Sequence, residues 1–116
     1  MTRKTRRSEP DPMDLIRLAA LADNRGDLPE AIEAVERASV HDRTRDWAAY
    51  DRAMLLLRSG DRDGAYASLI DATETRATVI RSQAALQLAH LAHLDEQDDL
   101  ELYWLKRANR SRPPGR

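Results

Sequence analysis

Apolar residues recur along most of this chain at intervals of three and four, which is the spacing of one face of an α-helix. Short polar breaks divide the pattern into six stretches, and none of them alternates with the period of two that marks a strand. The pattern therefore predicts an all-α protein of six helices, which begin near residues 12, 28, 46, 62 and 79 and just after Asp95.

Three of the breaks lie 34 residues apart, at Asp27, Asp61 and Asp95. Glycine precedes the first two, as Gly26 and Gly60. A glycine just past a helix end adopts the left-handed conformation that closes the helix, and an aspartate can then cap the next helix through its free N–H groups. A helix end and a helix start within two residues predict a tight helical hairpin, and a constant period of such hairpins is typical of a helical repeat array.

The third hairpin departs from this pattern. Leu94 stands where the other two turns have glycine, so the turn into Asp95 lacks its most suitable residue. The acidic residues Asp95, Asp98 and Asp99 still favour a helix start, since the N-terminus of a helix carries a partial positive charge. We expect a third hairpin with the same period and a divergent sequence.

The second helix of each hairpin carries a small, a large and a small residue at spacings of four and three. The three sets are Ala31–Val35–Ala38, Ala65–Leu69–Ala72 and, displaced by one residue, Leu100–Trp104–Ala108. With the turn glycines, this pattern resembles the tetratricopeptide repeat (TPR) family over residues 12–109, with repeats at about 12–43, 46–77 and 79–109. The resemblance implies three antiparallel hairpins stacked as a short right-handed superhelix. Arg52 departs from it, because the family usually has leucine there, and an unrelated helical bundle is the alternative.

The resemblance also implies a concave groove, lined by the first helix of each hairpin, that binds a peptide or a partner helix. Trp47 and Tyr50 are the strongest candidates, because tryptophan, tyrosine and arginine carry much of the binding energy of protein interfaces. The alternative for Trp47 is a place in the core between hairpins. The predicted groove residues are Ile16, Asp23, Asn24, Trp47, Tyr50, Met54, Leu57, Arg58, Ala85 and Ala89.

Charge is distributed unevenly along the chain. Residues 13–105 have a net charge of −8, although the whole chain has a net charge of −1. We predict a flexible basic arm over residues 1–11 and a flexible basic tail over residues 110–116. These two segments suggest a second hypothesis, in which the protein binds nucleic acid electrostatically. The basic residues that would make the contacts are Arg3, Lys4, Arg6, Arg7, Arg110 and Arg112.

The last predicted helix carries more apolar surface than one neighbouring helix can cover. A helical repeat needs a polar face where the array ends, because each unit buries its face on the next one. We therefore predict self-association as a homodimer through the C-terminal hairpin, at Leu100, Tyr103 and Trp104.

The remaining chemistry in the sequence is sparse. The chain has no cysteine, which fits a reducing, cytoplasmic setting, and no apolar run approaches the length of a membrane span. His90 and His93 share a helix face, but no third metal ligand follows from the spacing. No nucleophile motif or phosphate-binding glycine loop is present. We expect a protein-binding module that is not an enzyme and uses no cofactor or metal.

Overall fold

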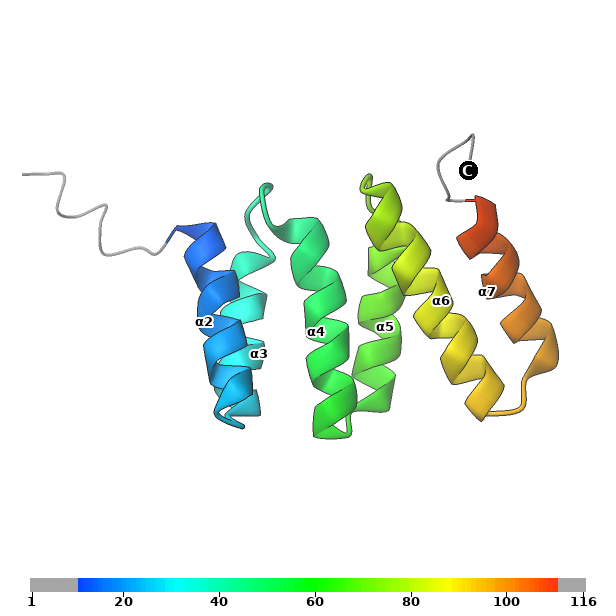
Figure 1. Ribbon diagram of the computed structural model, residues 1–116, viewed down its shortest axis with the longest axis horizontal. Coiled ribbons are helices and arrows are strands. Elements are labelled where there is room, and N and C mark those ends of the chain that lie inside the picture. The colour runs from blue at the N-terminus through cyan, green and yellow to red at the C-terminus, as the bar shows by residue number, and fades with distance from the viewer. Residues whose placement is uncertain (1–10, 111–116) are drawn as a thin grey trace, which may run out of the picture.

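The computed structural model describes residues 11–110, which form six α-helices and no strand. The helices are α2 (Pro12–Asn24), α3 (Leu28–Ala38), α4 (Arg45–Ser59), α5 (Arg62–Ala72), α6 (Thr78–Leu94) and α7 (Asp98–Arg110). They pair as three antiparallel hairpins, α2 with α3, α4 with α5 and α6 with α7, which lie in a row along the 58 Å long axis (Figure 1). The predicted all-α class and the pairing into hairpins are confirmed.

The first two hairpin turns have the predicted geometry. Gly26 and Gly60 have positive φ angles of 82° and 93°. Asp27 and Asp61 follow them, and each side chain accepts a hydrogen bond from the backbone N–H three residues further on, at 3.2 and 2.9 Å. Each aspartate thus satisfies an N–H group that the first turn of the helix leaves free.

The third turn lies two residues later than predicted. Leu94 is still helical, and Glu96 takes the left-handed conformation with φ 58°. The N–H of Gln97 bonds to the carbonyl of Ala92 at 2.9 Å, which is the bond that Asp27 and Asp61 make in the other turns. The last helix begins at Asp98, so the prediction that it begins just after Asp95 is corrected. Leu94 is the last residue of α6, and the left-handed residue follows two positions later, at Glu96.

This shift fixes the register of the third hairpin. Because Gly26, Gly60 and Glu96 occupy the same place in their turns, equivalent positions lie 34 residues apart between the first two hairpins and 36 apart between the last two. Predicted groove residues Ala85 and Ala89 are consequently turned into the core, where both are buried. Placing them in the groove was wrong, since it assumed a constant period.

Replacing Glu96 with glycine is expected to raise the free energy of unfolding by about 1 kcal/mol, because glycine adopts positive φ without the steric cost that an L side chain has. Chemical denaturation followed by circular dichroism measures the change. Glu96→Ala is the matched control, since it removes the same carboxylate but keeps the Cβ atom. Equal stability of the two variants would contradict the left-handed assignment.

Two clusters of buried side chains hold the row together, and α4 contributes to both. Ala48 and Leu55 pack in the cluster of the first hairpin, whereas Ala53 packs with the third hairpin. Many of the buried residues are alanines, so the helices can approach closely. Helix α4 is therefore covered on two sides.

Arg52 links the first two hairpins from within α4. Its Nε atom donates to Glu36 on α3 at 3.0 Å, and a terminal nitrogen donates to the buried Ser68 hydroxyl on α5 at 2.5 Å. This position, where the TPR resemblance leads us to expect leucine, therefore holds a polar bridge.

Candidate functional site

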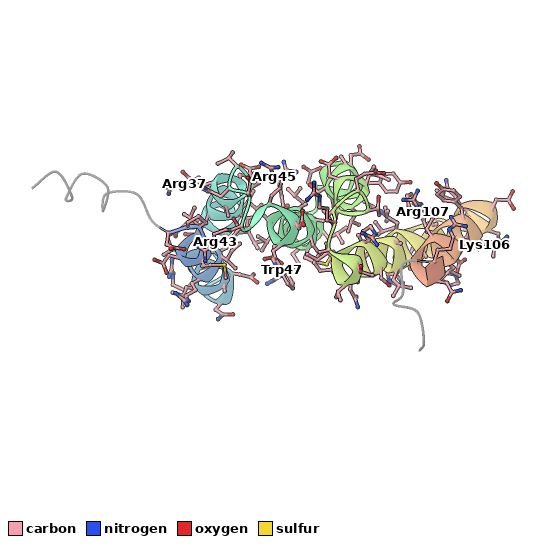
Figure 2. The ribbon with its side chains drawn as sticks, turned by 90° about the horizontal axis from the view of Figure 1, so that it is seen from above. Arg37, Arg43, Arg45, Trp47, Lys106 and Arg107 are labelled. Atoms are coloured by element: carbon pink, nitrogen blue, oxygen red, sulfur yellow. The ribbon has the colours of Figure 1, made fainter. Side chains whose placement is uncertain are left out.

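The row of hairpins has two unlike sides. Figure 2 shows Trp47 projecting from α4 on the side where α2 and α6 lie, and Arg45 projecting on the opposite side, where α3 and α5 lie. We call these the first-helix side and the second-helix side, after the helix of each hairpin that forms them. The groove predicted from the sequence belongs to the first-helix side.

An open, largely apolar pocket of about 200 Å³ lies on the first-helix side between α2 and α4. Its lining includes four of the predicted groove residues, Ile16, Asp23, Met54 and Arg58. The other lining residues are Ala19, Ala20, Val35, Asp51 and Leu55. The structure thus brings together residues from two hairpins that the sequence placed in one groove.

Helical spacing explains why these side chains meet. On α4, residues 47, 51, 54 and 58 follow one another at intervals of four, three and four, so they share one face. On α2, residues 16, 20 and 23 do the same. The two faces lie opposite each other along the pocket.

One end of the pocket is closed by an ion pair. A terminal nitrogen of Arg58, at the end of α4, pairs with a carboxylate oxygen of Asp23, near the end of α2. The Asp23 side chain is more buried than that of Arg58. Asn24 lies next to this pair and is exposed.

Asp51 is the charged group of the pocket that sequence reasoning missed. Burial raises the pKa of the Asp51 carboxyl above its usual value. Within residues 11–110, no hydrogen-bond donor or cation pairs with this carboxylate. Its charge therefore lacks compensation, and a cation supplied by a ligand would stabilise it. The sequence signal that could have identified Asp51 as a pocket residue is its place on α4, one turn after Trp47 and three residues before Met54.

Trp47 is 54% exposed, so the alternative that it fills the core between hairpins is wrong. It precedes Asp51 by one helical turn on α4 and is not among the residues that line the pocket. Tyr50 and Leu57 differ from it, because both are partly buried against the core cluster that includes the third hairpin. On α6, the corrected register puts Leu86 and His90 at the positions of Tyr50 and Met54, and both are exposed.

A larger cleft, of about 880 Å³, lies on the second-helix side and was not predicted. It is lined by Ser39, Asp42, Arg45, Asp46, Ala49, Arg52, Ser68, Asp71, Glu74, Thr75 and Arg76. Charges of both signs line it, and Arg45 and Arg52 are already paired, with Asp42 and Glu36. These pairs neutralise two of the three arginines that line the cleft.

The residues predicted for self-association lie in different environments. Trp104 is buried in the core of the C-terminal hairpin, and Leu100 is partly buried beside it. Tyr103 is exposed and meets the Trp104 ring edge-on, with 4.8 Å between the ring centres. Trp104 is therefore a packing residue of its own hairpin, and its prediction as a surface contact is corrected.

Three further features are the two histidines, the apolarity of the helices and the basic residues of the two ends. His93 pairs with Glu101 at 3.2 Å and Asp95 with Arg62 at 2.9 Å, and residues 11–110 contain no group of three side chains suited to holding a metal ion. In the same range, no helix has both the length and the apolarity needed to cross a bilayer. The arm residues Arg3, Lys4, Arg6, Arg7 and Arg112 lie outside the described part, whereas Arg110 ends α7.

Fold and pocket together define an all-α protein of three antiparallel helix hairpins with an apolar pocket between the first two. Comparison with protein-family models, with curated proteins and with solved structures gave no match.

Proposed function

We propose that this chain is a non-catalytic protein-interaction module whose first-helix side binds a peptide or a partner helix. The observation that carries the proposal is the open apolar pocket between α2 and α4, with the unpaired Asp51 in its wall and the exposed Trp47 one helical turn before Asp51. Ligand sites of proteins commonly combine an apolar lining with a few polar groups that fix orientation.

The pocket suggests the chemistry of the ligand. An aliphatic side chain fits the surface of Ile16, Ala20 and Met54, which is apolar and open. A lysine or arginine nearby in the ligand would pair with Asp51, and Trp47 would cover the aliphatic part of that side chain or contact its charge. We infer that the preferred segment carries an apolar and a basic residue close together.

We further infer that the stack is TPR-like. Support comes from the geometry of the first two turns and from the small–large–small pattern of α3 and α5. It also comes from the packing between hairpins, in which α4 packs on α3 and α6 packs on α5. In that arrangement α2, α4 and α6 line the concave side, where the pocket lies.

Peptide display tests the proposal directly. Segments selected on the intact protein are expected to share an apolar residue near a lysine or arginine. Trp47→Ala is expected to weaken their binding up to about tenfold, because an aromatic contact contributes about 0.5–1.5 kcal/mol. Asp51→Asn should weaken the binding of basic peptides and leave neutral peptides unchanged. Fluorescence anisotropy of labelled peptides measures both effects.

Two variants serve as controls. Val40→Ala removes an exposed apolar side chain outside the pocket, and Asp71→Asn removes an exposed carboxylate on the second-helix side. Neither is expected to change peptide affinity. Selected peptides that bind Trp47→Ala and Asp51→Asn as tightly as the unaltered chain would place their site elsewhere and contradict the proposal.

A further inference from the structure

One kind of interface occurs twice within the chain. The first helix of a hairpin packs on the second helix of the hairpin before it, as α4 does on α3 and α6 on α5. The corrected register makes it possible to compare the same position in all three hairpins.

On the second helices, Val35, Leu69 and Leu105 are equivalent. Val35 and Leu69 are fully buried, because the next hairpin covers them. Leu105, on α7, is 42% exposed. The side of α7 that carries Leu105 therefore has the apolar side chain of an internal interface but no partner within residues 11–110.

On the first helices, Leu21, Leu55 and Leu91 are equivalent. Leu55 and Leu91 are buried, whereas Leu21, on α2, is 55% exposed. The neighbouring Leu18 shows the same contrast, since it is exposed and its equivalent on α6, Leu88, is fully buried. The side of α2 that carries Leu18 and Leu21 is thus the other half of the same interface.

These two half-interfaces lie on the helices at opposite ends of the row, α2 and α7 (Figure 1). We propose that copies of this chain associate head to tail, with α2 of one copy packed on α7 of the next. Leu21 and Leu18 of one copy then cover Leu105 of the other, as Leu91 and Leu88 cover Leu69 within the chain.

Charge favours the same pairing. Val35 and Asp51 line one pocket across the first internal interface. The equivalent positions at the two ends hold Leu105 and Arg17, so Arg17 would approach α7 beside Leu105. Glu101, which is acidic, stands one turn before Leu105. Arg17 and Glu101 pair within the chain with Asp14 and His93, and the contact would place their opposite charges at adjoining positions.

The proposed contact is heterologous, because it joins two unlike surfaces and leaves a free half-interface at each end of the assembly. It differs from the homodimer predicted from the sequence, in which two copies of the C-terminal hairpin meet. Its consequence is a longer row of hairpins, in which the first-helix sides of successive copies form one continuous surface.

Sedimentation equilibrium of the intact chain tests the proposal. The weight-average mass is expected to rise with concentration, and Leu21→Asp and Leu105→Asp are each expected to abolish the rise. An equimolar mixture of these two variants should form a dimer and nothing larger, because one variant keeps the α7 surface intact and the other keeps the α2 surface intact.

Val40→Asp is the matched control, since it puts the same charge at an exposed apolar position away from both ends, and it should associate like the unaltered chain. Circular dichroism checks that each variant is folded, and Leu105→Lys replaces Leu105→Asp if the aspartate unfolds α7, because lysine favours helix. Three results would overturn the proposal: a monomer at millimolar concentration, self-association of Leu21→Asp alone, or a monomeric mixture.

Discussion

Leu69→Ala is expected to lower the free energy of unfolding by about 2–5 kcal/mol, whereas Leu105→Ala at the equivalent position of the last hairpin should change it by about 1 kcal/mol or less. Leu69 is fully buried between the second and third hairpins, so its truncation loses apolar burial and leaves a cavity. Leu105 is partly exposed, and alanine is a good helix former, so little is lost there.

Urea denaturation at low protein concentration, where association is negligible, measures both changes on the same scale. Val35→Ala provides a further comparison, because Val35 is the fully buried equivalent in the first hairpin. A similar loss of stability in Leu69→Ala and Leu105→Ala would contradict the assignment of equivalent positions, and with it the description of α7 as the open end of the row.

Trp104→Ala is expected to lower the free energy of unfolding by about 3–5 kcal/mol, because a large buried aromatic ring is lost from the C-terminal hairpin. Trp104→Phe should cost much less. Within the described residues, the indole N–H of Trp104 is buried without a hydrogen-bond partner, so phenylalanine keeps most of the apolar burial and removes an unsatisfied donor.

Thermal and urea denaturation of the two variants measure this difference, and fluorescence supplies a check on the environment. With Trp47→Phe as background, the remaining emission from Trp104 should be that of a buried tryptophan and should shift to the red only on unfolding. A solvent-exposed emission from the folded chain, or a small effect of Trp104→Ala, would show that Trp104 lies at the surface.

Local signals were enough to predict the helices and the first two turns from the sequence. Gly26 and Gly60 supply the positive φ, Asp27 and Asp61 supply the caps, and helical periodicity supplies the helices, and each signal depends only on residues close in sequence. The structure has both turns at the predicted positions, and five of the six helices in residues 11–110 begin within one residue of the predicted start.

The third turn was mispredicted because its local signal is ambiguous. Without a glycine, the aspartate at the expected period was the only guide, and Asp95 pairs instead with Arg62 of another hairpin. Glu96 carries no sequence signature of a left-handed residue. The two-residue shift then moved the predicted groove residues Ala85 and Ala89 into the core.

The sequence predicted only some of the residues that line the pocket. Ile16, Asp23, Met54 and Arg58 followed from the TPR resemblance, which assigns the first helices to one surface. The degree of burial of each side chain depends on how the hairpins pack, so the sequence alone could not separate the exposed Trp47 from the half-buried Tyr50. Nor did any local pattern identify Asp51 as unpaired, since a partner could have come from any neighbouring helix.

Amide chemical-shift mapping tests most directly whether the first-helix side binds the partner. When a peptide selected on the intact protein is titrated into the labelled chain, the largest shifts are expected at Ile16, Trp47, Asp51 and Met54, with little change around Ser39 and Asp71 in the cleft of the second-helix side. Shifts that concentrate in that cleft, with the pocket between α2 and α4 unperturbed, would contradict the claim.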